Sequence, residues 1–151
     1  MKKFKLTSEF IVDISGVKLF RIKALIEFGN VKAGDLGGYI EKEKNLSHMG
    51  NAWVSGNAQV SGNAWVFGDA QVFGDARVSG DKDYAYAHGF GSCNRTTTFF
   101  RLKDGDVGVR CGCFYGTLAQ FRDKVCETHG ETKKAQEYLM LADLMEIRFK
   151  N

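Results

Sequence analysis

The chain has 151 residues, a formal net charge of +3, 44% hydrophobic and 26% charged residues, values typical of a globular protein rather than a disordered polar chain. No apolar run approaches the roughly 20 residues needed to span a bilayer, and Glu9 and Asp13 interrupt the apolar stretch that a secretion signal would need. Lysines and arginines are spread too thinly for a duplex nucleic-acid binder. We therefore expect a cytoplasmic protein whose four cysteines are reduced thiols.

The first segment, residues 1–30, is predicted to be a β-hairpin cap. Apolar residues alternate with polar ones from Phe4 to Ile14, and a Ser15-Gly16 turn leads into a second apolar run that begins at Val17. The next stretch, Gly34-Asp35-Leu36-Gly37-Gly38, is expected to be an irregular entry into the middle of the chain.

Residues 50–80 contain a six-residue repeat, which is the most specific pattern in the sequence. Glycine recurs at positions 50, 56, 62, 68, 74 and 80, alanine at 52, 58, 64, 70 and 76, and valine at 54, 60, 66, 72 and 78. In an extended segment Ala and Val, two residues apart, face the same side, while Gly followed by Asn or Asp tolerates the backbone of a turn. The repeat predicts very short strands with an Ala/Val core and a turn at every glycine.

This pattern resembles the hexapeptide-repeat, left-handed β-helix family. The resemblance implies a mainly β fold, with a short left-handed parallel β-helix over residues 31–89 between the hairpin cap (1–30) and a C-terminal α+β module (90–151). Family members are often homotrimers packed around a threefold axis. Outward aromatic residues suggest such an oligomer interface, and they are Trp53, Trp65, Phe67 and Phe73. The alternative is that other parts of the same chain cover these four side chains.

The C-terminal module reads as strands followed by helices. Strands are predicted over residues 96–102 and 107–111, joined by the turn Lys103-Asp104-Gly105-Asp106. Thr117 is a plausible N-cap for a helix that ends at His129-Gly130, a second helix is expected over residues 132–144, and residues 145–149 are expected to close the sheet as a strand.

Several motifs together resemble a family of uncharacterised phage and prophage proteins that are often labelled polymer-forming or hexapeptide-repeat proteins. These motifs are Gly-Asp-Leu-Gly-Gly-Tyr-Ile-Glu, the hexads, Gly-Ser-x-Asn-Arg-x-Thr-Thr and Cys-Gly-Cys-Phe-x-Gly-Thr. The resemblance implies a setting, the cytoplasm of the host cell, rather than an activity.

The few histidines and cysteines suggest two kinds of chemistry, acyl transfer and zinc binding. Hexapeptide acyltransferases use a histidine base on a loop between coils, but no loop interrupts the hexads here, and His48 and His88 lie at their ends. Cys111, Cys113, Cys126 and His129 offer zinc ligands, but their spacing is off-pattern, and Cys126 is more simply a small core residue. We expect no metal and no cofactor.

An anion site is the third candidate, in the C-terminal module. A glycine-containing loop precedes a strand with arginines and hydroxyls, and Gly116-Thr117 opens a helix whose free N–H groups favour an anion. The predicted ligand-binding residues are Asn94, Arg95, Thr97, Arg101, Arg110, Tyr115, Gly116 and Thr117. The alternative is that Asn94 and the threonines satisfy backbone groups while Arg95 is solvated.

These expectations combine into a non-enzymatic, oligomeric binding protein. The favoured hypothesis is an anti-defence protein that sequesters a host nucleotide immune signal in pockets between subunits of a trimer. A protein–protein inhibitor of a host defence enzyme is the alternative, and a CoA-dependent acyltransferase is the third hypothesis.

Overall fold

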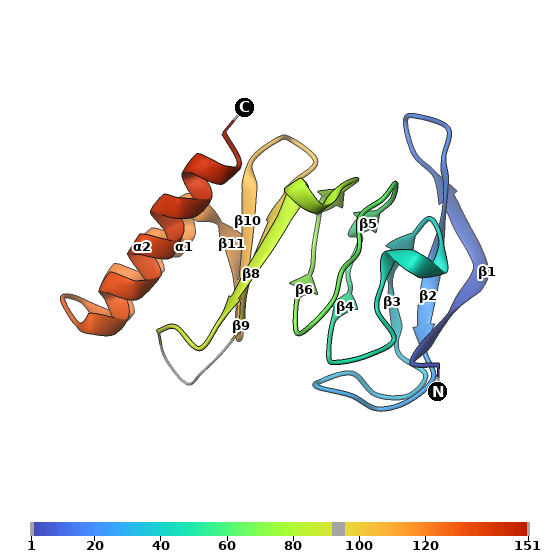
Figure 1. The fold of residues 1–151 in the computed structure, drawn as a ribbon, viewed down its shortest axis with the longest axis horizontal. Coiled ribbons are helices and arrows are strands. Elements are labelled where there is room, and N and C mark those ends of the chain that lie inside the picture. Colours follow the sequence, from blue (N-terminus) through green and yellow to red (C-terminus); the bar gives the residue numbers. More distant parts are fainter. Residues whose placement is uncertain (1, 92–95, 151) are drawn as a thin grey trace.

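The computed structural model describes residues 2–91 and 96–150. Figure 1 shows a β-hairpin at one end of an elongated molecule, short strands in the middle, and a second sheet covered by two helices at the other end. The described strands form a five-stranded sheet in the order β1-β2-β3-β5-β7, a four-stranded sheet in the order β11-β10-β9-β8, and the pair β4-β6.

The N-terminal hairpin consists of β1 (Phe4–Val12) and β2 (Lys18–Ala24), which pair antiparallel. Its turn is closed by Asp13, whose carboxylate accepts hydrogen bonds from the N–H groups of Ser15 and Val17 at 2.8 and 3.0 Å. Gly16 has φ +87°, a conformation that favours glycine. The sequence-based expectation of a hairpin with this turn is therefore confirmed.

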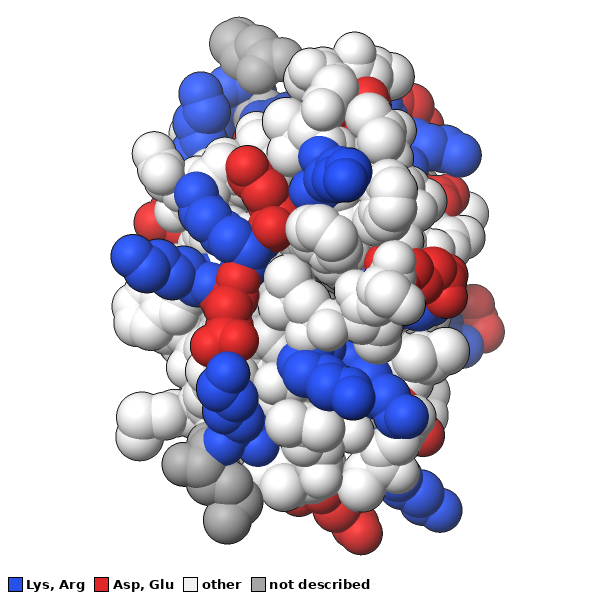
Figure 2. Space-filling model, turned by 90° about the vertical axis from the view of Figure 1, so that its right-hand side faces the viewer, with Lys and Arg blue, Asp and Glu red and all other residues white. Residues whose placement is uncertain are grey.

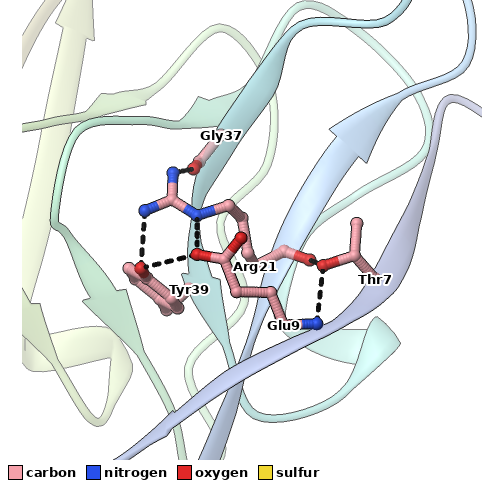
Figure 3. Close-up of polar contacts among 5 residues, drawn as sticks. All are labelled: Thr7, Glu9, Arg21, Gly37 and Tyr39. Carbon is pink, nitrogen blue, oxygen red and sulfur yellow. Dashed lines mark hydrogen bonds and ion pairs between the residues drawn. The ribbon is translucent and has the colours of Figure 1, made fainter.

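A bulge in β1 shapes the outer face of this hairpin. The register shifts between Leu6 and Phe10, which brings Glu9 beside Arg21 of β2. The Arg21 guanidinium also donates to the carbonyl of Gly37 and the hydroxyl of Tyr39 (Figure 3). This polar cluster fastens β3 (Leu36–Ile40) to the hairpin. Figure 2 shows positive and negative side chains interspersed over this end of the molecule, with no patch of one sign.

The hexad segment forms very short parallel strands. β4 (Trp53–Val54) pairs with β6 (Gln71–Val72), and β5 (Gln59–Val60) pairs with β3 on one side and with β7 (Arg77–Val78) on the other. The alanine and valine registers are buried throughout, and they form one core cluster with Phe4, Ile22, Ile40 and Phe100. The repeat thus encodes the core of the middle segment through its two apolar registers.

The predicted fold class, a mainly β protein with a left-handed parallel β-helix over residues 31–89, is wrong. Parallel pairing is confined to two-residue stretches, and it continues on one side into the antiparallel hairpin sheet. On the other side, residues 84–88 form β8 of an antiparallel sheet, and two long helices follow. The protein is a mixed α/β protein. The expected resemblance to hexapeptide β-helix proteins of the phage type is therefore wrong as well. Five hexads bury too little surface to form a stable β-helix of their own, and their short strands pair instead with neighbouring segments such as β3.

The C-terminal half is an antiparallel sheet covered by helices. Its strands are β8 (Tyr84–His88), β9 (Thr96–Arg101), β10 (Val107–Cys111) and β11 (Phe114–Thr117). The helices are α1 (Leu118–His129) and α2 (Lys133–Arg148). A second core cluster lies between this sheet and the helices and includes Phe99, Phe121 and Tyr138. The expected final strand over residues 145–149 is wrong, because Met145 lies within α2 and packs into this core.

An ion pair joins the middle segment to the C-terminal sheet. Asp83 is buried and accepts hydrogen bonds from the backbone N–H and the hydroxyl of Ser79, both at 3.0 Å, and from Arg101 at 3.1 Å. Arg148 of α2 donates to the carbonyls of Asp81 and Tyr84, just before and within β8. Within the described ranges, no helix is long and apolar enough to cross a membrane.

Candidate functional site: a groove over strands β4 and β6

A groove of about 800 Å³ crosses the middle of the molecule over β4 and β6. Its floor is made by outward-facing residues of the hexads, Asn51, Trp53, Ser55, Asp69, Gln71 and Phe73. One wall is the loop between β2 and β3, contributed by residues 29–31 and 35–36. The opposite wall comes from the C-terminal sheet, with His88, Thr96, Arg110, Gly112 and Cys113. The groove therefore needs all three segments of the chain.

Strand geometry explains the floor. Alternation turns Ala and Val inward at each hexad, so the residues between and beside them face out. Trp53 and Gln71 lie opposite each other across the β4–β6 pair, and the Gln71 amide donates to the carbonyl of Asn51 at 3.0 Å. The ring of Phe28 packs edge-on against Trp53 with centroids 5.2 Å apart. The floor thus combines amide side chains with a Trp53 ring that Phe28 largely covers.

Arg110 is the only arginine or lysine among the described residues that line the groove. Its guanidinium lies 4.3 Å from the centroid of the Phe73 ring, and its Nε donates to the carbonyl of Gly112 at 3.2 Å. No carboxylate pairs with it among the residues that the structure describes. The Arg110 guanidinium is therefore held in place by its contact with the Phe73 ring and by the hydrogen bond from Nε. The N–H groups of its two terminal nitrogens make no hydrogen bond with the described residues.

The wall formed by the β2–β3 loop and the adjoining floor carry two carboxylates. Asp35 accepts a hydrogen bond from the N–H of Lys32 at 2.9 Å and so stabilises the loop. Asp69 is half-buried at the start of the β6 hexad. Two acidic residues and the Arg110 guanidinium thus line the same groove.

Lys3 is a buried lysine next to this floor. Its ammonium donates to the carbonyls of Ala52 at 2.7 Å and Gly50 at 3.4 Å, and it lies 4.6 Å from the centroid of the Phe28 ring. Burial lowers the pKa of Lys3 to about 8, although the charge of Asp69 opposes this change. Lys3 fixes the backbone under the groove and does not enter it, because its side chain is almost fully covered.

The structure brings Arg110 and Tyr115 together as cross-strand partners, but it gives most of the other predicted anion-site residues structural contacts. Thr97 is buried and donates to the sulfur of Cys111, and Arg101 pairs with Asp83. Thr117 caps α1 by accepting from the N–H of Gln120, and Gly116 packs against the Gln120 side chain. Tyr115 packs against Phe73 and Gly74. Of the eight residues only Arg110 lines the groove, and Asn94 and Arg95 lie outside the described residues.

The four predicted interface aromatics divide into two pairs. Trp53 is 4% exposed under Phe28, and Phe73 lies beneath Arg110 and Tyr115. Trp65 and Phe67 are 49% and 37% exposed and stack on each other with centroids 4.5 Å apart. The chain itself covers the first pair, whereas the second pair remains open for a contact with another molecule.

The residues considered for other chemistry have local structural contacts. His48 stacks on Phe4, its Nδ1 accepts from the N–H of Lys3 at 3.1 Å, and its Nε2 lies 3.3 Å from Glu43. The Nδ1 of His88 lies 2.8 Å from the hydroxyl of Thr96. Across the described ranges, no three Cys, His, Asp or Glu side chains gather as a metal site would require.

Sequence reasoning missed most of the groove, including Asp69, Gln71 and Thr96. The outward register of the hexads is the sequence signal for this floor, although the same register also predicts an oligomer surface. No protein-family model matches the chain, and the search of curated proteins found no match.

Proposed function

We propose that this protein binds a small planar anion of the nucleotide class in the groove over β4 and β6. The carrying observation is the Arg110 guanidinium, which lies over Phe73 at the groove with no carboxylate partner among the described residues. An arginine that is fixed in orientation offers two parallel donors to a phosphate.

The size and lining of the groove support this ligand class. Small-molecule sites usually enclose about 300–1,000 Å³ and combine aromatic surface with a few polar groups. Here the half-buried Phe73 ring and the largely covered Trp53 ring lie near the amides of Asn51 and Gln71 and the hydroxyls of Ser55 and Thr96. A planar base can be accommodated by such a floor, and its phosphate by Arg110.

Binding is favoured over acyl transfer by the surroundings of the histidines. A general base needs a ring nitrogen free to take a proton from the substrate. Both ring nitrogens of His48 have neighbours within the chain, Lys3 and Glu43. His88 lines the groove with its Nδ1 beside the Thr96 hydroxyl, and no carboxylate of the described residues contacts it to orient the ring as a general base. The proposal therefore assigns this site a ligand and no reaction.

The proposed site lies within one chain, unlike the inter-subunit pockets expected from the sequence. Sequestration of a host nucleotide immune signal, and assembly as a homotrimer, stay predictions. Inhibition of a host protein also stays a prediction, and the exposed Trp65–Phe67 stack is the feature that favours it.

Isothermal titration calorimetry tests the proposal with a panel of nucleoside monophosphates and cyclic dinucleotides. We expect at least one member to bind, and Arg110→Met to weaken that binding about 10- to 100-fold, because a charged hydrogen-bonding partner of the phosphate is lost. Arg122→Met is the control, since Arg122 pairs with Asp143 and Glu146 on the helices, away from the groove lining. Binding that Arg110→Met leaves unchanged, or no binding by any panel member, contradicts the proposal.

A further inference from the structure

The two sides of the groove differ in charge, which bears on the identity of the ligand. We infer that the ligand carries an amino-substituted base, of the adenine or cytosine type, and that Asp69 accepts a hydrogen bond from its amino group while Arg110 binds its phosphate. This inference rests on the proposed function and adds the chemical class of the base.

Asp69 is a free acceptor at the floor of the groove. Its backbone carbonyl accepts a long hydrogen bond of 3.5 Å from the Gln71 amide, whereas its carboxylate makes no hydrogen bond or ion pair with the described residues. An ionised carboxylate only accepts hydrogen bonds. It therefore favours a ligand group that donates at this place.

The ammonium of Lys3 does not satisfy this carboxylate. Lys3 interacts with Asp69 through its charge, but its hydrogen bonds go to the carbonyls of Ala52 and Gly50. The Asp69 carboxylate thus has no hydrogen-bonding partner among the described residues, and Asp69 lines the groove.

Gln71, which lies near Asp69 on the floor, also favours a ligand group that donates a hydrogen bond. The Gln71 amide nitrogen is committed to the carbonyl of Asn51, which leaves the Gln71 side-chain oxygen as an acceptor. The hexad floor therefore offers acceptors in the same groove as the half-buried Phe73 ring. An amino group on a planar ring matches both properties.

Adenine and hypoxanthine provide a matched pair of probes. Hypoxanthine carries a carbonyl oxygen where adenine carries its amino group, so IMP places an acceptor against the Asp69 carboxylate. When the carbonyl oxygen of hypoxanthine and the Asp69 carboxylate face each other with no hydrogen between them, binding should be weaker by about 1–3 kcal/mol, which corresponds to roughly 5- to 150-fold in affinity. CMP and UMP form the equivalent pyrimidine pair.

The experiment measures binding of AMP, IMP, CMP and UMP by calorimetry to the wild-type chain, to Asp69→Asn and to Asp75→Asn. Asp75 occupies the same register in the next hexad, but it pairs with Lys103 and does not line the groove. We expect the amino-bearing member of at least one pair to bind at least 10-fold more tightly to wild type. Asp69→Asn, whose amide both donates and accepts, should reduce this preference below about threefold, and Asp75→Asn should keep it.

Two results overturn the inference while leaving the proposed function intact: equal, Arg110-dependent binding within both pairs, or a preference that persists in Asp69→Asn. If none of the four nucleotides nor any cyclic dinucleotide binds, the proposed function itself fails. Circular dichroism melting of Asp69→Asn, compared with Asp75→Asn, shows whether each variant remains folded.

Discussion

The buried Lys3 ammonium should make the free energy of unfolding rise with pH between pH 8 and 10.5. Its ammonium is almost fully covered and bonds to two backbone carbonyls, and burial holds its pKa at about 8, compared with 10.5 in the unfolded chain. Below pH 8 the amine is protonated in both states. Between pH 8 and 10.5 the folded state loses its proton first, so the unfolded state binds more protons and the free energy of unfolding rises with pH.

The size of this effect follows from the two pKa values. A difference of 2.5 pKa units corresponds to a total of about 3 kcal/mol, of which about 2.5 kcal/mol develops between pH 7 and pH 10. Lys3→Met keeps most of the side-chain volume and removes the titrating group. The difference in unfolding free energy between wild type and Lys3→Met should therefore change by about 2.5 kcal/mol in favour of wild type as the pH rises over this range.

Urea unfolding followed by circular dichroism at pH 7, 8, 9 and 10 measures this difference. Because other titrating groups, including Tyr84, are common to both proteins, they cancel in the comparison. Lys5→Met is the matched control, since Lys5 lies two residues further along the chain, in β1, and is exposed. A wild-type minus Lys3→Met difference that stays constant from pH 7 to pH 10 would refute the reasoning.

Three further predictions concern the turns, the buried ion pair and the aromatic surface. Gly62→Ala should lower the free energy of unfolding by at least about 2 kcal/mol and the melting temperature by about 4–8 °C, because Gly62 has φ +62° and a Cβ there would collide with the carbonyl of Ser79. Gly80→Ala is the control and should have little effect, since a Cβ at Gly80 meets open space. Burial raises the pKa of Asp83, but hydrogen bonds from Ser79 and Arg101 outweigh burial and lower the pKa below its usual value. Asp83→Asn should therefore lower the free energy of unfolding, measured with urea, by about 2 kcal/mol at pH 7, and this loss should shrink as acid protonates the wild-type carboxylate. Light scattering after gel filtration should show an oligomer that Trp65→Lys dissociates, and a wild-type monomer at micromolar concentration would contradict the predicted interface.

Local patterns in the sequence predicted local structure well. The Ser15-Gly16 turn, the capping role of Thr117 and the end of α1 at His129 follow from short-range chemistry, and the structure has each of them. The burial of alanine and valine in the hexads follows from alternation. These features depend on residues within a few positions of one another.

The overall architecture depends on which edges the hexads present to the rest of the chain, and the repeat does not encode this. Phe100 illustrates the difficulty, because it comes from β9 and yet completes the core of the hexads. The same difficulty applies to the groove. Arg110 meets Phe73 only because β10 is placed over β6 by the intervening strand β9, whose Thr98 accepts from the N–H of Gln71. Such contacts join residues far apart in sequence, and spacing alone gives no sign of them.

The groove differs from the two cores in how it is held together. Its floor strands are only two residues long, so the β4–β6 pair contributes few backbone hydrogen bonds of its own. Rigidity comes from beneath and from the sides, where Lys3 binds the backbone below and the Asp83–Arg101 pair anchors the C-terminal sheet. A ligand that contacts both Arg110 and Asp69 connects the C-terminal wall to the hexad floor. Its binding free energy then adds to the stability of the junction between the two halves, by an amount that grows with the ratio of ligand concentration to dissociation constant.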